Sequence, residues 1–243
     1  MQTDLVTYLA VAEKKVKQSP AQTFILSILA GVFIALAGAL ATTVSWQIDN
    51  ISLAKLLAGL VFPVGLILVI MWKTELFTGN ILLLVAYWQG KIKGKELWRN
   101  WLLVYLGNFI GALLIVNLLY YCWSGNENLL LSLAKIAENK INLSILKAFI
   151  LGVLCNFLVT LAVWWGVTKT TFLEKLVLIF LPIFTFVVLG FEHSVADMFY
   201  LPWAKIIFDN TSWLSLSISL LFITLGNIVG GAITALILNS QQK

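Results

Sequence analysis

The chain consists mainly of long apolar stretches in which apolar and polar residues do not alternate. Each stretch reaches the roughly 20 residues that a helix needs to cross about 30 Å of hydrocarbon. A continuous apolar pattern predicts helices, because the strands of a membrane β-barrel alternate apolar and polar positions. The six predicted segments run from Ala21 to Trp46, Leu53 to Trp88, Leu97 to Trp123, Ile141 to Val167, Leu173 to Phe208 and Trp213 to Leu238.

The composition supports this reading. Hydrophobic residues make up 60% of the 243 residues and charged residues only 11%. The mean hydropathy is +0.96. Soluble domains have about 45–50% apolar and about 25% charged residues. We therefore expect one all-α transmembrane domain over residues 1–243, embedded in a lipid bilayer, with little chain left for a soluble catalytic domain.

The second and fifth segments are too long for one straight crossing, and each has polar residues in its middle. Residues 73–80 read Lys-Thr-Glu-Leu-Phe-Thr-Gly-Asn, and residues 190–197 read Gly-Phe-Glu-His-Ser-Val-Ala-Asp. Irregular backbone at membrane depth is tolerated only where protein or water satisfies its polar groups. We therefore predict that both segments are broken helices that line a cavity.

A weak internal repeat relates the two halves of the chain. Residues 106–112 (Leu-Gly-Asn-Phe-Ile-Gly-Ala) resemble residues 225–231 (Leu-Gly-Asn-Ile-Val-Gly-Gly), 119 residues later, and Glu75 and Glu192 are 117 residues apart. Three helices followed by three similar helices enter the membrane from opposite sides. This pattern predicts an inverted repeat, and broken helices at matching positions are typical of a transport site.

The positive charge follows the topology expected of a membrane protein. The net charge is +5. With the N-terminus inside, ten Lys and Arg residues fall on the cytoplasmic side and five outside, which predicts that both termini are cytoplasmic. We expect a multi-pass protein of the plasma or inner membrane and no nucleic-acid partner. The ten cytoplasmic cations are Lys14, Lys15, Lys17, Lys91, Lys93, Lys95, Arg99, Lys169, Lys175 and Lys243.

Ionisable residues inside a membrane segment are candidates for function because their desolvation is costly. Lys73, Glu75, Glu192 and His193 form this group. His193 is the only histidine, and the usual pKa of histidine, near 6.5, allows proton exchange at physiological pH. The alternative is a histidine that only hydrogen-bonds a helix break.

We expect no metal site, no cofactor and no disulfide. A single histidine is too few for a bis-histidine haem or a histidine-rich zinc site, and the two cysteines, Cys122 and Cys155, lie inside apolar segments.

Three motifs in order resemble the formate/nitrite transporter family. They are residues 75–80 (Glu-Leu-Phe-Thr-Gly-Asn), residues 152–159 (Gly-Val-Leu-Cys-Asn-Phe-Leu-Val) and residues 190–194 (Gly-Phe-Glu-His-Ser). The resemblance runs from about Glu13 to the last helix. It implies an aquaporin-like fold and a homopentamer in which each protomer has its own pore for a small monovalent anion. It implies a channel or transporter and not an enzyme.

The resemblance also implies roles for particular residues. His193 matches a central pore histidine, Thr78 the threonine that faces it, and Asn156 and Glu192 the polar partners around it. Lys140 and Lys15 match lysines that attract anions in the vestibules, and the hydrophobic constrictions match Phe62, Leu66, Phe77 and Phe186.

The chain departs from the family pattern at two places. Residues 72–74 (Trp-Lys-Thr) stand where small residues are usual, and Thr160 replaces a common cysteine. Lys73 is either a charge that raises anion occupancy near the break or, as we favour, a buried partner of Glu75 or a subunit contact.

The implied mechanism is transport of a weak acid. Between two apolar rings, His193 would exchange a proton with the substrate, which crosses as a neutral acid or as an anion paired with the histidine. We expect formate or nitrite together with protons, and a hydrosulfide or lactate/acetate channel is the alternative. A neutral-solute aquaporin should have paired Asn-Pro-Ala motifs, which do not occur. An intramembrane enzyme using Glu75, Glu192 and His193 would lack a nucleophile or metal ligands.

Overall fold

The computed structural model describes residues 2–208 and 210–240, and this part of the chain is entirely helical. Lys243, counted above with the cytoplasmic cations, lies outside the described residues. The helices are α1 (Gln2–Lys17), α2 (Pro20–Ser45), α3 (Ile51–Val61), α4 (Val64–Met71), α5 (Phe77–Asn80), α6 (Leu83–Trp88), α7 (Gly94–Cys122), α8 (Glu127–Ile141), α9 (Ile145–Thr168), α10 (Phe172–Leu189), α11 (Ser194–Ile207) and α12 (Trp213–Ser240).

Six stretches of the described chain are long and apolar enough to cross a membrane, which confirms the predicted number. They are Pro20–Ser45, Ile51–Met71, Gly94–Cys122, Ile145–Thr168, Phe172–Ile207 and Trp213–Ser240. The second and fifth are broken, as predicted. The second has an additional interruption at Pro63, between α3 and α4, where proline lacks the N–H that a continuous helix uses.

Small polar residues just outside the apolar stretches fix where the spanning helices begin. Ser19, Asn50, Ser144 and Thr171 each accept a hydrogen bond from the backbone N–H three residues later. Such N-caps satisfy one of the four N–H groups that every helix start leaves open. The beginnings of α2, α3, α9 and α10 are therefore defined by the sequence locally.

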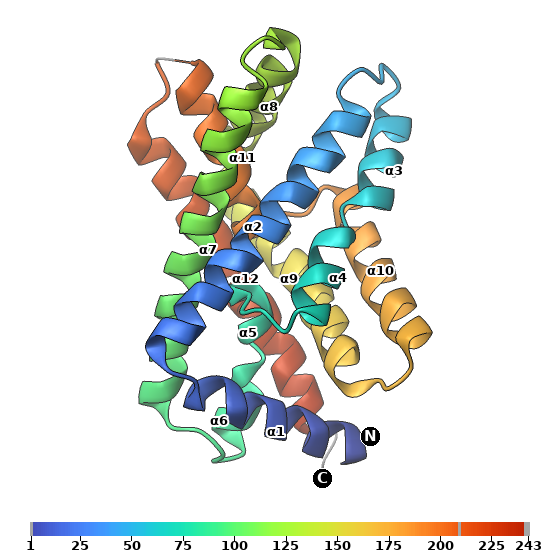
Figure 1. The fold of residues 1–243 in the computed structure, drawn as a ribbon, viewed down its shortest axis with the longest axis vertical. Coiled ribbons are helices and arrows are strands. Elements are labelled where there is room, and N and C mark those ends of the chain that lie inside the picture. The colour runs from blue at the N-terminus through green and yellow to red at the C-terminus, as the bar shows by residue number, and fades with distance from the viewer. Residues whose placement is uncertain (1, 209, 241–243) are drawn as a thin grey trace.

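Helix α8 lies where the sequence pattern predicts only a connection. It ends at Ile141, and the fourth spanning helix begins at Ile145, four residues later than predicted. Helix α8 is too short and too polar to span a membrane, so the apolar pattern of the sequence does not reveal it. Its buried side is formed by Leu129, Leu130, Leu133, Ala134 and Ala137. Figure 1 shows α8 at one end of the bundle and α1 at the other.

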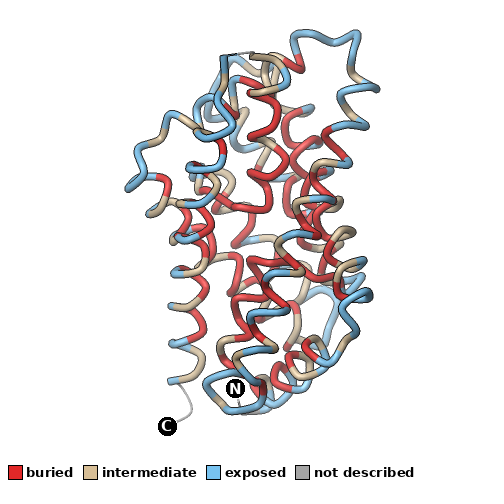
Figure 2. The backbone as a smooth tube through the Cα atoms, turned by 90° about the vertical axis from the view of Figure 1, so that its left-hand side faces the viewer, coloured by how far each residue is buried: buried red, intermediate tan, exposed pale blue. Residues whose placement is uncertain are grey.

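Close packing of helix backbones joins equivalent pairs of helices, α2 with α7 and α9 with α12 (Figure 1). A Cβ added at Gly111 would lie 2.1 Å from the carbonyl oxygen of Ile28, and one added at Gly230 would lie 2.1 Å from that of Val153. Small residues permit this approach in membrane helices. Both halves therefore use the same contact between a glycine and a backbone carbonyl. The buried segments of the backbone run along the middle of the bundle (Figure 2).

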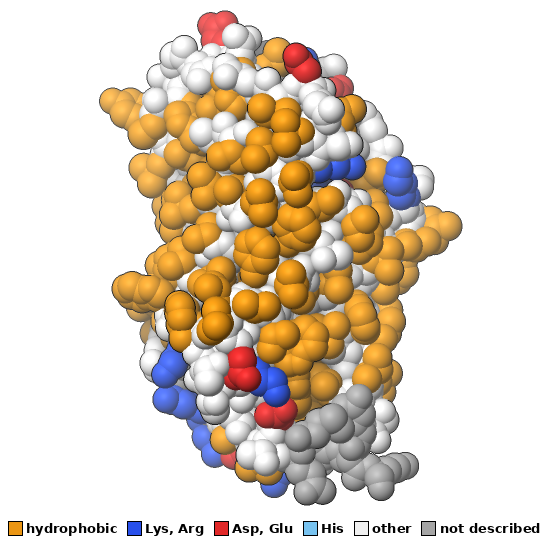
Figure 3. Space-filling view, turned by 90° about the vertical axis from the view of Figure 1, so that its right-hand side faces the viewer, with side chains coloured by type: hydrophobic (Ala, Val, Ile, Leu, Met, Phe, Trp, Pro, Cys, Tyr) orange, Lys and Arg blue, Asp and Glu red, His pale blue; other side chains and the backbone are white. Residues whose placement is uncertain are grey.

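The outer surface is apolar over the height of the spans. On the face shown in Figure 3, hydrophobic side chains cover the middle and charged side chains lie toward the two ends. The protein is a multi-pass membrane protein. Exposed apolar side chains on the spans include Leu36, Leu60, Leu106, Leu118, Leu181 and Leu225.

We expect Gly111→Ala to destabilise the protein, because its methyl group would overlap a backbone carbonyl of α2 that cannot move independently. Overpacking of this kind costs about 1–3 kcal/mol. Thermal unfolding in detergent should show a lower midpoint. Gly125→Ala is the matched control, since nothing lies within 4 Å of a Cβ at that position. Equal midpoints for the two variants would contradict the packing argument.

Candidate functional site

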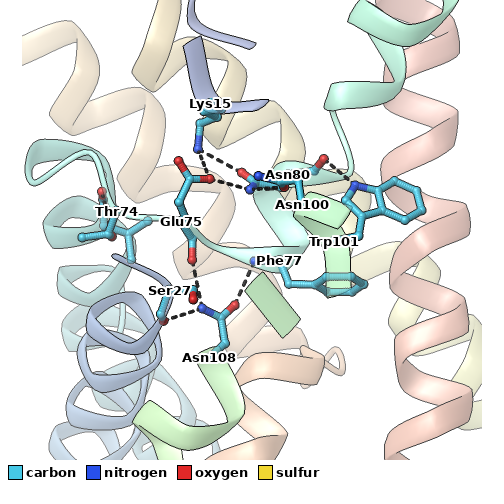
Figure 4. A network of polar contacts seen from close by, with 10 residues as sticks. Lys15, Ser27, Thr74, Glu75, Phe77, Asn80, Asn100, Trp101 and Asn108 are labelled. Atoms are coloured by element: carbon cyan, nitrogen blue, oxygen red, sulfur yellow. Dashed lines mark hydrogen bonds and ion pairs between the residues drawn. The ribbon is translucent and has the colours of Figure 1, made fainter. Parts of the chain in front are cut away.

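One asparagine from α7 holds the break between α4 and α5. Asn108 is fully buried, and its Oδ1 accepts a hydrogen bond from Phe77 N at 2.9 Å. Its Nδ2 donates to the carbonyl oxygens of Ser27 at 2.7 Å and of Glu75 at 2.9 Å (Figure 4). The N–H of Glu75 donates to the carbonyl of Leu26 at 3.3 Å. The break therefore has protein partners for backbone groups that lipid cannot satisfy.

The break between α10 and α11 has the same arrangement around an asparagine from α12. Asn227 accepts from Ser194 N at 2.8 Å and donates to the carbonyl oxygens of Gly152 at 2.8 Å and of Glu192 at 2.9 Å. The N–H of Glu192 donates to the carbonyl of Leu151 at 3.4 Å. Because each hydrogen bond has a counterpart in the first half, the predicted inverted repeat is confirmed.

The two breaks bring Thr78 and His193 together. Thr78 Oγ1 lies 2.8 Å from His193 Nε2, and both side chains are buried. His193 is the N-cap of α11, and its Nδ1 accepts a hydrogen bond from Ala196 N at 3.1 Å. Since Nδ1 is an acceptor, the neutral ring has its proton on Nε2. Nε2 then donates to the threonine oxygen, and the threonine hydroxyl hydrogen is available for another acceptor.

A small cavity lies beside His193, and its other walls are apolar. The rings of Phe62 and Phe186 meet edge to face at 5.8 Å, and the ring of Phe186 stacks on His193 at 5.8 Å. Three of the four residues expected at the constrictions line this cavity, and Phe77 instead packs against Tyr105 at 4.9 Å. The lining consists of Ile34, Phe62, Leu66, Leu76, Val159, Ile183, Phe186 and His193.

Sequence reasoning missed four of the lining residues, and the repeat contained a signal that locates them. Ile183 lies 117 residues after Leu66, and His193 lies 117 residues after Leu76, the same separation as between Glu75 and Glu192. Ile34 and Val159 form a third pair and are 125 residues apart, and Phe62 and Phe186 are 124 residues apart. Two of the four pairs therefore share the separation of the glutamates, and each half contributes four residues to the lining.

Asn156 connects this centre to α12. Its Nδ2 donates to the carbonyl oxygen of Thr78 at 3.2 Å and to that of Asn227 at 2.7 Å. Asn156 thus lies close to the Thr78–His193 pair and holds the backbone that carries Thr78. Thr160, one turn later, donates to the carbonyl of Asn156 at 2.5 Å and contacts Thr234 at 2.9 Å. The departure at Thr160 is accommodated by these hydrogen bonds.

Lys15 from α1 pairs with the buried carboxylate of Glu75 at 2.9 Å (Figure 4). The expectation that Lys73 is the buried partner of Glu75 is wrong. Lys73 is exposed and adopts a left-handed backbone conformation, with φ of 53°, which directs the chain out of α4 into the break. Its contact with another subunit stays a prediction. Lys15 is thus part of an ion pair and not an isolated vestibule charge.

Lys140 from α8 is the corresponding cation near the second break. Its Nζ lies 2.5 Å from Glu192 Oε2 and 2.8 Å from Asp197 Oδ1. Burial alone would lower the pKa of Lys140, but the negative charge on the carboxyl groups of Asp197 and Glu192 outweighs burial and raises it above its usual range. Lys140 is therefore charged. Its side chain is only 16% exposed, so the expected vestibule lysine is engaged by two carboxylates.

The geometry is that of a small apolar cavity between the two halves of a repeat, and the family model described as formate/nitrite transporter matches residues 4–240. The chain belongs to the formate/nitrite transporter family. This confirms the resemblance carried by the three motifs, and it confirms the expectation of a transport protein and not an enzyme.

Known relatives of this family member cover nearly its whole length. The formate channel FocA of Haemophilus influenzae is 37% identical over 246 residues, which span 91% of this chain and 87% of the relative. A solved pentameric formate channel with formate bound is 34% identical, with a TM-score of 0.82 and coverage of 93% and 98% of the two chains. A solved FNT family ion channel is 27% identical, with a TM-score of 0.89 and coverage of 100% and 99%.

The predicted aquaporin-like fold is also confirmed. The structure resembles the aquaglyceroporin from Plasmodium falciparum with a TM-score of 0.58 at 15% identity, over 91% of this chain and 96% of that one. At this identity the likeness concerns the fold alone.

We expect Asn108→Ala to destabilise the transporter, because it leaves the Phe77 N–H and two carbonyl oxygens without their partner in a buried site. Each unsatisfied group costs about 1–3 kcal/mol. Asn117→Ala is the control, since Asn117 is exposed on the same helix and bonds only to the Leu113 carbonyl. The yield of folded protein and the thermal midpoint in detergent measure the effect. A variant at position 108 as stable as the control would disprove this role.

Proposed function

We propose that this protein passes formate through a pore in each protomer of a homopentamer. Two observations support the proposal. The cavity between the breaks is apolar except for His193, with Thr78 beside it. Two of the relatives named above are formate channels, and one of these two is pentameric with formate bound.

The apolar walls select against a hydrated ion. A bare carboxylate loses most of its water between Phe62 and Phe186, and this desolvation is costly without compensating hydrogen bonds. Thr78 offers its hydroxyl hydrogen to an arriving carboxylate. When Nε2–H turns from the threonine oxygen to the anion, His193 offers a second donor, and the two donors match the two oxygens of a carboxylate. A small anion such as formate is therefore stabilised at the Thr78–His193 pair, while Asn156 holds the backbone of Thr78 and Glu192 pairs with Lys140.

Proton exchange at His193 requires a change at Nδ1. In the neutral ring Nδ1 accepts from Ala196 N–H, so a proton can bind Nδ1 only when this hydrogen bond is released. An arriving anion compensates the imidazolium charge and favours a small rotation of the ring away from α11. A proton from the aqueous side binds Nδ1, and the imidazolium gives its Nε2 proton to formate, which leaves as neutral formic acid. The ring then has its proton on Nδ1, and release of this proton with uptake of one at Nε2 restores the hydrogen bond from Ala196 N.

Nitrite, hydrosulfide and lactate or acetate are the alternatives. All are conjugate bases of weak acids with few atoms, so the same donors and the same proton step apply. We place formate first because two of the relatives named above are formate channels.

We further propose that the end of the bundle with α1 faces the cytoplasm of a plasma or inner membrane. The start of α1 and the end of α12 lie at this end (Figure 1). The basic residues that close α1, Lys14, Lys15 and Lys17, agree with the positive-inside rule. Lys15 then draws anions toward the inner vestibule and Lys140 toward the outer one, each within its ion pair.

The role of His193 can be tested by measuring formate uptake and current in the same proteoliposomes between about pH 5 and about pH 8. His193→Phe removes both donor and acceptor and should abolish electroneutral uptake. Thr78→Val should reduce uptake to a smaller degree. His193→Asn can still cap α11, but it cannot exchange a proton, so we expect anion current without electroneutral uptake.

Asn117→Ala provides the matched background for these measurements, because it alters an exposed amide of α7 away from the cavity. If His193→Asn retains pH-dependent, electroneutral uptake at the wild-type rate, then the histidine is only structural and the mechanism fails. Competition of labelled formate with nitrite, hydrosulfide and lactate in the same vesicles ranks the alternative substrates.

We expect five copies in mild detergent, because the apolar outer faces of the spans can pack against neighbouring copies as well as lipid. Native mass spectrometry measures the mass of the assembly directly. A stable monomer or dimer that transports formate after reconstitution would contradict the pentamer while leaving the pore proposal intact.

A further inference from the structure

The cluster around Lys140 contains one carboxyl group more than the matching cluster around Lys15. Lys15 contacts Glu75 and the side-chain amide of Asn80. Lys140 contacts Glu192 and the carboxyl group of Asp197. Asn80 and Asp197 are 117 residues apart, the same separation as between the two glutamates. The inverted repeat therefore has an amide in one half where the other half has an acid.

The amide of Asn80 makes two kinds of hydrogen bond that hold its cluster together (Figure 4). Its Oδ1 accepts from Lys15 Nζ at 3.0 Å, and its Nδ2 donates to Glu75 Oε2 at 2.6 Å. The remaining Nδ2 hydrogen is donated to Asn100 Oδ1 at 2.9 Å. The positive charge of Lys15 balances the negative charge of Glu75, so the cluster is neutral. The carboxylate of Glu75 accepts hydrogen bonds from both Lys15 and Asn80.

An ionised Asp197 can reproduce only the first of these interactions. Its Oδ1 lies 2.8 Å from Lys140 Nζ, the same atom that contacts Glu192 Oε2, but an ionised Asp197 has no hydrogen to donate to Glu192. Asp197 is 0% exposed, and among the described residues neither of its carboxyl oxygens has a hydrogen-bond partner, although Oδ1 is in the ion pair with Lys140. Two ionised carboxylates with one ammonium would leave a net negative charge in a buried site, which is strongly disfavoured.

We propose that Asp197 holds a proton on Oδ2 and donates it to the carboxylate of Glu192, so that Lys140, Glu192 and Asp197 form a proton-binding site separate from His193. A protonated carboxyl group has the shape of a carboxamide, with one acceptor and one donor. It therefore reproduces the two contacts that Asn80 makes with a lysine and a glutamate in the first half. The ligand of this site is a proton.

The other ionisable groups near Asp197 do not compensate its charge. Helix α7 contributes Tyr105, α9 contributes Cys155, and α11 itself contributes Tyr200. His193 lies in the adjacent break and is neutral in the tautomer described above. Helices α2, α5 and α12 pack against α11 and have no ionisable side chain. Lys140 is thus the cation that balances Glu192, and the second acid needs a proton.

The consequence for transport rests on the proposed function. When rising pH removes the proton, the cluster gains a negative charge beside the path to His193, and this charge repels an approaching anion. At an effective dielectric constant of about 20, one such charge about 12 Å from the anion lowers anion occupancy roughly tenfold. Uptake of formate by the wild type should therefore fall with rising pH. The fall should be larger than the decrease that the lower proton concentration alone causes.

The proton can be observed without transport. Infrared spectroscopy of the reconstituted protein separates the carbonyl stretch of a carboxylic acid from the bands of ionised carboxylates. We expect an acid band in the wild type that shifts when aspartate is labelled with carbon-13 at its side-chain carboxyl. Asp197→Asn should lose this band and keep the pentamer, because it installs the amide found in the other half.

Asn80→Asp is the mirror variant, since it installs a second acid beside Lys15 and Glu75, and it should gain a new aspartic acid band. A wild type without an acid band that depends on Asp197 between about pH 5 and about pH 8 would overturn the proposal. A band that shifts only with labelled glutamate would overturn it as well, because the proton would then be on Glu192.

Uptake of formate by Asp197→Asn should lose the additional pH dependence and equal the wild-type rate at acidic pH. If the wild type takes up no formate at any pH, the proposed function fails, while the infrared result still decides whether Asp197 holds a proton. If Asp197→Asn keeps the full wild-type pH dependence, the electrostatic consequence is wrong.

Discussion

A helix that is broken inside a membrane leaves backbone N–H and carbonyl groups without partners, and the rest of this structure depends on how they are satisfied. Asn108 and Asn227 each accept one backbone N–H and donate to two carbonyl oxygens across a break. An asparagine suits this position because its side chain offers an acceptor and two donors without a charge. These contacts fix the starts of α5 and α11 at the centre of the bundle, where Thr78 and His193 meet.

The two halves share a backbone arrangement but differ in the side chains that it presents. The counterpart of His193 in the first half is Leu76, and the counterpart of Thr78 in the second half is Val195. Each break therefore carries one polar and one apolar side chain at these two positions, and the polar ones, Thr78 and His193, meet at the centre. Had both halves kept the same residues, the site would contain two imidazoles or none. Because the two halves differ at these positions, the cavity has one titratable ring, that of His193, beside one hydroxyl group, that of Thr78.

The long apolar runs predicted the six crossings, and the polar clusters predicted both breaks, because lipid imposes a strong constraint on composition. The amphipathic helix α8 and the second interruption at Pro63 were missed, since neither changes the apolar pattern enough to be seen. The pairing of Thr78 with His193 came from the family resemblance and not from spacing. The partner of Glu75 was predicted as its near neighbour Lys73, but Lys15 approaches through the packing of α1, a long-range contact that sequence proximity does not indicate.

The buried charges lie on both sides of the central pair, and their arrangement bears on how an anion is handled. Lys15 with Glu75 lies near the first break, and Lys140 with Glu192 and Asp197 lies near the second. Each cation is already balanced by a carboxylate, so neither provides a strong fixed site that would retain an anion. Weak attraction at both ends suits a path that must release its substrate as readily as it admits it. The two ends differ in the second acid, Asp197. If this carboxyl group gains or loses a proton, the net charge changes at the end with Lys140 and stays the same at the end with Lys15.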